Sequence, residues 1–318
     1  MAFQDIKPID SWKFYCDLAL RRANAAAEQL RSKAFKGRFE KSKGIEMQKI
    51  SIIRNTLHNK LTDIIRSFPD FDKLTQFYQE LVKITLDYEM LMHSLGALTS
   101  ARKKIIDLFV EYNKRFIRTK EQGKLNVLRR EFAGRSFSVM KNIRKNLEFL
   151  EEARKILSDF PSIKHEMKKA AIAGFPNVGK STLLTKISKS KPEIAAYAFT
   201  TKRLNIGYYE KDGKKIQLID TPGTLNRLEK MNFIEKQAYV AMKYAADAII
   251  YVFDLTEEYP LKDQVKLYDM IKEFRKPIII YLSKTDITGR EIIDEFKKRY
   301  RDSIDSADKL KDELDKLL

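Results

Sequence analysis

One short run of the sequence, Gly174-Phe175-Pro176-Asn177-Val178-Gly179-Lys180-Ser181-Thr182, has the residue types and spacing to hold a triphosphate. Its glycines let successive backbone N–H groups turn inward around the anion, while Lys180 reaches the β and γ oxygens and Ser181 offers a hydroxyl to Mg²⁺. An apolar segment at residues 170–173 precedes the run, and apolar residues at helical spacing follow it. We therefore predict a phosphate-binding loop between a strand and a helix. The alternative is a chance match in a Gly-containing turn.

The residues expected to contact the nucleotide in this loop are Phe175, Pro176, Asn177, Val178, Gly179, Lys180, Ser181 and Thr182. A second motif is expected to complete the metal site from the end of a later strand. Residues 216–219 alternate like a strand and end in Asp220-Thr221-Pro222-Gly223, about 40 residues after Lys180. Both motifs must meet at one end of a parallel sheet. We predict that Asp220 holds Mg²⁺ through water and that Gly223 donates its N–H to the γ-phosphate; a buried turn aspartate is the alternative.

The segment between these motifs, residues 197–202, is polar and aromatic without a helical period, so it is predicted to be a loop. A threonine there would place its hydroxyl on Mg²⁺ and its N–H on the γ-phosphate only while that phosphate is present. We favour Thr201 for this role, with Thr200 second, and we count Phe199 and Thr200 among the nucleotide contacts. An ordinary turn before the next strand is the alternative for either threonine alone.

The choice of base depends on two buried strands, predicted at residues 248–254 and 277–282, and on Ser283-Lys284-Thr285-Asp286 after the second. The Asp286 carboxylate can accept two hydrogen bonds from guanine N1–H and N2–H₂, which adenine cannot donate. The stem of Lys284 can lie over the base plane. Ser306 and Ala307, before the last helix, are a further expected contact. The sequence therefore predicts a guanine nucleotide, with Ser181, Thr201 and Asp220 around Mg²⁺.

The order of these motifs resembles the translation-factor-type P-loop GTPases, and Gly174 to Ser181 together with Phe-Thr-Thr-Lys at 199–202 resembles their Obg-related branch. A helical N-terminal half that runs through Phe160-Pro161-Ser162-Ile163 into the phosphate loop is similar to the nucleolar GTP-binding protein 1 family, in the short form expected of an archaeon. The resemblance implies a GTP hydrolase that takes part in assembly of the large ribosomal subunit. Its partners would be large-subunit rRNA, the pre-ribosomal particle and ribosomal proteins.

The resemblance also bears on catalysis. The family's base motif usually begins with Asn where this chain has Ser283, which shortens one support of the guanine pocket. Thr224 and Leu225 follow the Asp-Thr-Pro-Gly motif, so no glutamine stands there to orient the attacking water, and slow unaided hydrolysis is expected. In related proteins an asparagine at the position of Asn177 helps to hold K⁺ beside the phosphates. The catalytic group is thus predicted to be Lys180, Thr201, Gly223 and Asn177.

The charge of the chain indicates a polyanionic partner. The net charge is +18, and residues 1–166 contribute +12 of it. Residues 101–145 alone carry 14 basic and 4 acidic residues. Heat adaptation would explain many charges of both signs but not this imbalance. Because a GTPase core does not require such an excess, RNA is the simplest partner.

The N-terminal half is predicted to be helical, because it is poor in proline and glycine and carries apolar stripes at helical spacing. The stripes place helices at residues 12–30, 46–67, 73–95, 101–117 and 123–157. We expect a basic, all-α antiparallel bundle over residues 1–160 and, over 166–318, an α/β P-loop GTPase domain with helices on both faces of a mostly parallel sheet. A break at Phe160-Pro161 separates the two.

The motifs and the charge distinguish three function classes. The leading interpretation is a GTPase that docks on rRNA, and the alternative is a GTP-dependent regulatory switch whose bundle binds a protein. A metabolic P-loop kinase is disfavoured, because the Asp220 and Asp286 motifs are typical of a switch. A single cysteine, Cys16, no long apolar run and no signal-peptide pattern lead us to expect a cytoplasmic monomer without membrane contact.

Overall fold

The computed structural model describes residues 3–31, 37–160, 163, 167–188, 193–195, 204–211, 213–221, 233–256 and 258–318. The chain forms two compact units. The first comprises Met1–Asp70 and Leu86–Ser158, and the second comprises Phe71–Thr85 and Asp159–Leu318. The expected domain limits, 1–160 and 166–318, stay a prediction, and each unit is described in turn.

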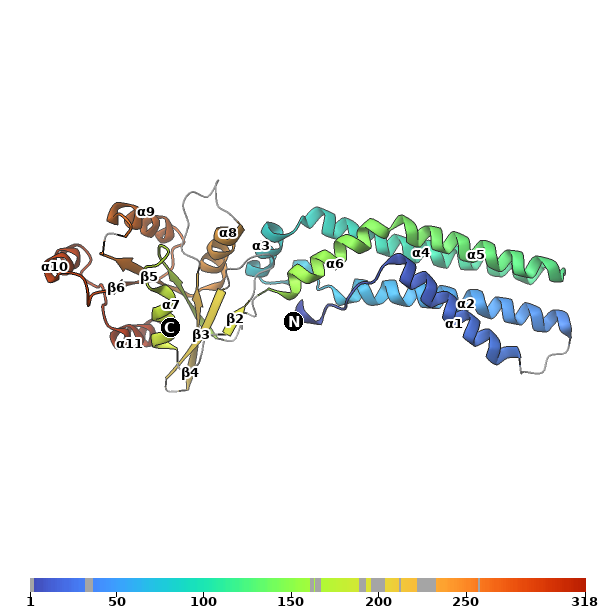
Figure 1. Ribbon diagram of the computed structural model, residues 1–318, viewed down its shortest axis with the longest axis horizontal. Helices are drawn as coiled ribbons and strands as arrows, with labels where there is room; N and C mark the ends of the chain where they lie inside the picture. The colour runs from blue at the N-terminus through green and yellow to red at the C-terminus, as the bar shows by residue number, and fades with distance from the viewer. Residues whose placement is uncertain are drawn as a thin grey trace. The chain divides into compact units, whose positions relative to one another are not determined.

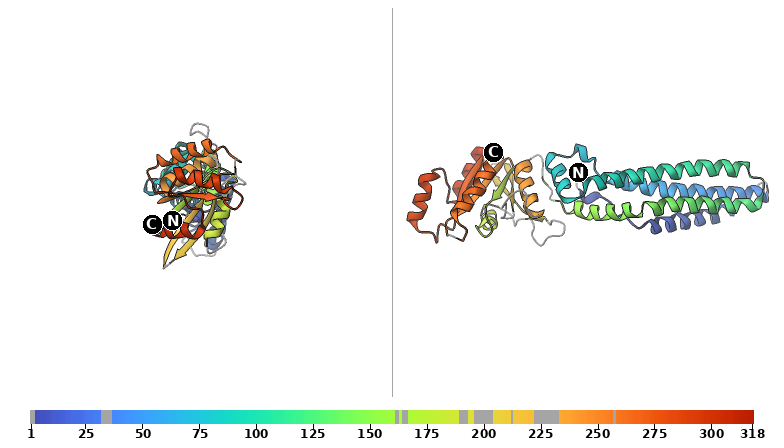
Figure 2. Two further views of the ribbon diagram at one scale, coloured as in Figure 1. Left: turned by 90° about the vertical axis from the view of Figure 1, so that its left-hand side faces the viewer. Right: turned by 90° about the horizontal axis from the view of Figure 1, so that it is seen from above.

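The first unit is a bundle of long helices that lie side by side in Figure 1 and in the right-hand view of Figure 2. Its elements are η1 (Phe3–Asp5), α1 (Trp12–Arg31), α2 (Arg38–Ser67), α4 (Tyr88–Arg118), α5 (Gln122–Asn142) and α6 (Arg144–Ser158). Helix α2 packs against α1, α4 and α5, and α4 also packs against α6. The apolar stripes meet in the core, where Leu57, Leu98, Tyr112 and Phe132 are fully buried. Within the described residues, no helix offers a stretch whose length and hydropathy fit a membrane span.

Several helix boundaries in the N-terminal half were predicted wrongly. The helix expected from residue 46 begins at Arg38. The pattern predicted a break between residues 95 and 101, whereas α4 runs unbroken from Tyr88 to Arg118. The break lies earlier because Asp87 caps α4, its side chain accepting the backbone N–H of Met90 at 2.9 Å. The helix expected over 123–157 is two helices, since Ile143 between α5 and α6 leaves helical geometry at φ −93° and ψ 12°.

The second unit is built on one six-stranded sheet in the order β2-β3-β4-β1-β5-β6 (Figure 1). The strands are β1 (Lys168–Ala173), β2 (Glu193–Ala195), β3 (Leu204–Lys211), β4 (Lys214–Asp220), β5 (Ala248–Asp254) and β6 (Ile278–Ser283). Strands β4, β1, β5 and β6 are parallel, while β2 and β3 run antiparallel at one edge. Both central strands, β1 and β5, are almost wholly buried, as expected for a sheet covered on both faces.

Helices cover the two faces of this sheet, which confirms the predicted α/β fold. They are α7 (Lys180–Ile187), α8 (Phe233–Val240), η4 (Ala241–Ala245), α9 (Leu261–Lys272), α10 (Arg290–Arg299) and α11 (Ala307–Leu317). Helices α7 and α11 pack together on one face, opposite α8 and α9 (Figure 1). The short elements η2 (Phe71–Lys73) and α3 (Gln76–Thr85) belong to this unit, with α3 packed on α8 and η4. The hydroxyl of Tyr78 in α3 accepts the N–H of Ile163 at 3.0 Å.

Candidate nucleotide site

The predicted motifs gather at one edge of the sheet. The phosphate-binding loop follows β1, Asp220 ends β4, and Ser283 ends β6. These three strands are parallel members of one sheet, so their carboxyl ends share that edge. In open α/β sheets this is the edge at which ligands bind.

The backbone of the loop needs glycine at its first position. Gly174 has φ +145°, and a Cβ atom there would lie 2.6 Å from the carbonyl oxygen of Val252 in β5. Gly179 has φ +92° and directly precedes α7. Asn177 also has a positive φ, of 60°, which asparagine tolerates better than most residues. The loop therefore leaves β1 close against β5 and delivers the N-terminus of α7 to the site, as an anion-binding loop requires.

Lys180 is held inside the loop. Its side chain is 6% exposed, and Nζ donates a hydrogen bond to the carbonyl oxygen of Phe175 at 2.6 Å. Burial lowers the pKa of Lys180 to about 8, although the negative charge of Asp220 opposes this effect. The ammonium is thus poorly solvated and positioned within the loop, so an anion placed there would gain a strong charge-assisted partner.

Asp220 is brought to the loop by sheet register, since Ile172 of β1 is paired with Asp220 of β4. Its Oδ2 atom accepts hydrogen bonds from Ser181 Oγ at 2.6 Å and from Asn205 Nδ2 at 3.0 Å. Its Oδ1 atom is buried, and no described residue donates a hydrogen bond to it. A buried carboxylate oxygen without a donor is costly unless a cation or water satisfies it.

These groups fit Mg²⁺. The hydroxyl of Ser181 and the carboxylate of Asp220 supply the hard oxygen ligands that Mg²⁺ takes, and Asp220 Oδ1 is an acceptor that lacks a described donor. Among the described residues no cluster of three or more acidic, His or Cys side chains forms a cage of protein ligands.

The predicted base motif continues from β6 at the same edge. Ser283 is buried, its hydroxyl donates to the carbonyl oxygen of Phe253 at 3.0 Å, and its Cβ lies 3.6 Å from where a Cβ on Gly179 would stand. Lys284 has φ +54°. Asp286, two residues on, is exposed and therefore accessible to a ligand. The phosphate loop and the base motif thus lie close together at Gly179 and Ser283.

The segment before α11 also reaches this edge. Ile304 forms a parallel bridge with Tyr281 of β6, and two backbone hydrogen bonds, to Ile280 and from Leu282, fix it there. Ser306 lies two residues further along, level with the end of β6, and Ala307 begins α11. The structure therefore brings Ser306 and Ala307 to the side of the base motif.

Glu258 joins the loop to the base motif. Its Oε1 accepts from Asn177 Nδ2 at 2.9 Å, and its Oε2 accepts from Lys284 Nζ at 3.0 Å. Lys284 also pairs with the buried carboxylate of Asp254 at 2.7 Å. The hydrogen bonds that Lys284 donates to Asp254 and to Glu258 raise the pKa of Lys284 and keep it charged, although burial opposes them. Lys180 is therefore held by the carbonyl oxygen of Phe175 in the phosphate loop, and Lys284 by the carboxylates of Asp254 and Glu258.

Four predicted site residues, Phe199, Thr200, Thr201 and Gly223, lie outside the described residues. Their assignments stay predictions. The same holds for the nucleotide contacts assigned to the other site residues, although the fold gathers these residues at one edge.

Two comparisons with known families agree with this geometry. Residues 3–164 match the NOG1 N-terminal helical domain, and residues 169–284 match the 50S ribosome-binding GTPase domain. The chain belongs to the nucleolar GTP-binding protein 1 family. Its second unit is a P-loop GTPase domain, the domain of a GTP hydrolase, and the protein is a GTP-binding protein of this family.

Relatives in this family extend across most of the chain. An uncharacterized protein of Methanocaldococcus jannaschii is 35% identical over 86% of this chain and 77% of its own length. Nucleolar GTP-binding protein 1 of Drosophila melanogaster is 31% identical over 93% of this chain, which spans only 46% of that relative. Among solved structures, Aquifex aeolicus Era bound to GDP·AlF₄⁻ is 27% identical over 48% of this chain and 57% of its own, with a TM-score of 0.38.

Sequence reasoning missed two polar residues of this GTPase domain. Asn205 stands directly opposite Asp220 in the antiparallel β3–β4 pair, so only the strand register reveals it. Glu258 lies in the turn between β5 and α9, where no local spacing distinguishes it from its neighbours. The sequence offered one hint of Asn205: it is a polar residue near the start of β3, the strand that precedes the one ending in Asp220.

The lowered pKa of Lys180 predicts that this side chain takes up a proton when the protein binds a nucleotide. A triphosphate stabilises the ammonium, so its pKa rises on binding. With a free-protein pKa of about 8, about a tenth of a proton should be taken up at pH 7 and about half at pH 8. GTP affinity should fall above pH 8, where the free protein must first gain the proton. Calorimetric titration at each pH in two buffers of different ionisation enthalpy measures the uptake; identical heats in both buffers at pH 8 would contradict it.

Proposed function

We propose that this chain binds GTP and GDP with Mg²⁺, hydrolyses GTP slowly, and acts in the cytoplasm as a nucleotide-controlled assembly factor that docks its basic bundle on large-subunit rRNA. The observation that carries the proposal is the joining of a GTPase site to a basic bundle in one chain. Of the 14 basic residues in 101–145, eleven are exposed. The 50S ribosome-binding GTPase match and the nucleolar names of relatives support the ribosomal context.

The residues of the site would divide the work of hydrolysis. Lys180 and the loop N–H groups stabilise charge that develops on the β and γ phosphates. Ser181, Thr201 and, through water, Asp220 would hold and orient the metal, and Gly223 would donate its N–H to the γ-phosphate. Bound Mg²⁺ would neutralise charge on the phosphate oxygens. A water would attack in line without a glutamine to orient it, which keeps the intrinsic rate low.

Binding to rRNA tests the proposal. The full chain should bind in vitro transcribed large-subunit rRNA, with an affinity that falls steeply as salt rises and that differs between GDP and a non-hydrolysable GTP analogue. Fluorescence anisotropy at several salt concentrations measures both effects. A protein that binds no rRNA in either nucleotide state lacks the proposed function.

A second function, a GTP-dependent switch that binds a protein, is favoured by one observation on α4. Ile106, Val110 and Ile117 lie at helical spacing and are 36%, 47% and 60% exposed. Such an apolar row can receive a partner helix. In that case affinity for rRNA would be weak and would change little with salt.

We expect K⁺ to stimulate hydrolysis through Asn177. The amide nitrogen of Asn177 donates to Glu258, so its amide oxygen is the atom that would bind a cation. GTP turnover in KCl should exceed that in NaCl on the order of tenfold, well below the effect of an arginine finger. Asn177→Gly, which tolerates the positive φ at this position, should remove the difference. Equal rates in the two salts for the unmodified protein would reject a role for K⁺.

A further inference from the structure

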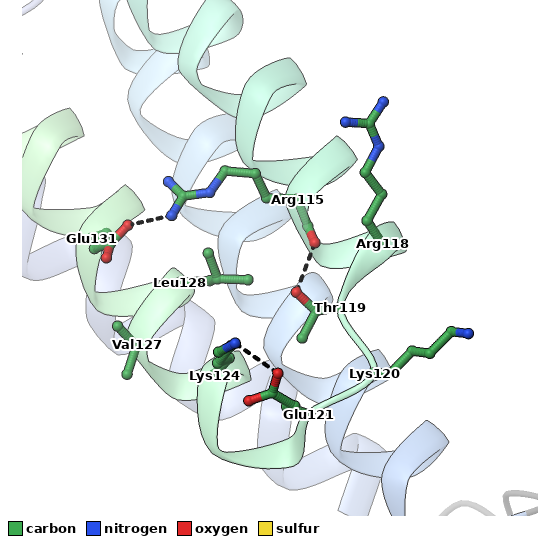
Figure 3. Close-up of a pocket in the computed structure, with 9 residues that line it drawn as sticks. All are labelled: Arg115, Arg118, Thr119, Lys120, Glu121, Lys124, Val127, Leu128 and Glu131. Carbon is green, nitrogen blue, oxygen red and sulfur yellow. Dashed lines mark hydrogen bonds and ion pairs between the residues drawn. The ribbon is translucent and has the colours of Figure 1, made fainter.

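A groove lies at one end of the bundle, between the last turn of α4 and the first turns of α5 (Figure 3). Its volume is about 660 Å³, within the range of ordinary ligand sites. Leu128, 5% exposed, forms part of its wall, and Val127 beside it is 52% exposed. We call it the α4–α5 groove. It belongs wholly to the first unit.

The lining of the groove is rich in cations. Arg115 and Lys124 already have carboxylate partners, Glu131 at 3.0 Å and Glu121 at 2.6 Å. Arg118 and Lys120 also line the groove; both are exposed, and the described part of the chain provides neither with an ion pair. Figure 3 shows their side chains extending away from the two ion pairs. Two positive charges at this groove are therefore not neutralised within the bundle.

The neighbouring start of α2 adds to this positive charge. Lys43 Nζ donates to the carbonyl oxygen of Ile117 at 2.9 Å, and Lys41 Nζ donates to that of Arg31 at 2.6 Å. These ammonium groups satisfy carbonyl oxygens at the ends of α4 and α1, where cations are favourable, and no carboxylate among the described residues forms an ion pair with either. The positive potential at this end of the bundle therefore extends beyond the groove.

We infer that the α4–α5 groove binds the phosphodiester backbone of RNA, an inference that rests on the proposed function and locates its docking contact. Arg118 offers a planar fork that matches a phosphate, and Lys120 supplies a second charge two residues away. Arg115 and Lys124 remain at the groove to share an incoming phosphate with their carboxylates. The exposed side chain of Val127 offers an apolar surface against which a ribose of the RNA can pack.

The experiment compares two charge-reversal pairs in the full chain. Arg118→Glu with Lys120→Glu alters the groove. Lys141→Glu with Lys145→Glu makes the same charge change on exposed residues near the other end of α5, about 25 Å from Lys124 along the helix. In vitro transcribed large-subunit rRNA is the ligand, with inorganic phosphate and polyglutamate as competitors, and circular dichroism confirms that each variant is folded.

The variant with Arg118→Glu and Lys120→Glu, the groove pair, should bind rRNA at least tenfold more weakly than the unmodified protein. The slope of log affinity against log salt should fall by about 1.4 to 1.8, as expected for two lost phosphate contacts. The control pair should stay within about threefold of the unmodified protein, because general charge alone changes there. Neither inorganic phosphate nor polyglutamate should displace the rRNA at equal charge concentration.

Equal losses in the two pairs would overturn the inference, because general charge would then explain binding. Displacement by polyglutamate would instead assign the groove to an acidic polypeptide, and displacement by inorganic phosphate to a free anion. If the unmodified protein binds no rRNA, the proposed function itself fails. If it binds rRNA and the groove pair binds equally well, only the location in the groove is wrong.

Discussion

Lys180→Ala should reduce the affinity for GTP by about 10² to 10⁴-fold. The ammonium would donate charge-assisted hydrogen bonds to the β and γ oxygens, each contributing about 1.5–3 kcal/mol, so losing two costs about 3–6 kcal/mol. The structure already holds Lys180 inside the loop, 6% exposed and bonded to the Phe175 carbonyl oxygen. Little conformational freedom therefore remains to be lost on binding. Calorimetry with GTP and Mg²⁺ measures the change.

The fold should tolerate this substitution, which separates a binding defect from unfolding. Burial disfavours the charged form of Lys180, as its lowered pKa shows, so removing the ammonium relieves a desolvation cost. The melting temperature should stay within a few degrees of the unmodified protein. Lys186→Ala, at an exposed lysine of the same helix, is the matched control and should bind GTP normally. GTP affinity retained in Lys180→Ala would contradict the assignment of the loop.

The elements that the sequence predicted well are those whose signal is local and long. The buried strands β5 and β6 appear as apolar runs, and their bounds, Ala248–Asp254 and Ile278–Ser283, differ from the prediction by one residue at most. The three-residue strand β2 was missed because its pairing with β3 is tertiary. The start of α4 was misplaced because capping by Asp87 decided it, while the apolar period continues on both sides.

In the candidate site, too, the residues with a local sequence signal were predicted and those that depend on tertiary structure were not. The phosphate loop, Asp220 and Ser283 were predicted because each motif lies at the end of a strand and parallel strands bring such ends together. Asn205 and Glu258 were not predicted, because one depends on antiparallel register and the other on a turn that folds back to Asn177. Sequence spacing thus predicted groups that the fold brings to one edge of the sheet, and only the fold revealed Asn205 and Glu258, which hydrogen-bond to some of them.

Asp286→Asn should reverse the base preference of the site. The carboxylate would accept the N1–H and N2–H₂ donors of guanine, whereas an asparagine amide offers one acceptor and one donor. The amide donor would oppose guanine but would suit xanthine, which has a carbonyl oxygen at the same position. GTP affinity should fall by at least about 10²-fold and XTP affinity should rise, because a donor that faces a donor loses a hydrogen bond and leaves both groups of the bound complex unpaired. Competition between GTP and XTP for a fluorescent nucleotide measures the switch.

The exposed position of Asp286 makes this a clean test of the base pocket. Burial does not constrain the side chain, so the substitution should leave the free energy of unfolding within about 0.5 kcal/mol. Asp294→Asn, which removes an equal charge at an exposed position on α10, should leave both affinities unchanged. Unaltered GTP binding by Asp286→Asn would remove Asp286 from the base pocket. Ser306 and Ala307, the other predicted contacts beside β6, would then be the first candidates for guanine selection.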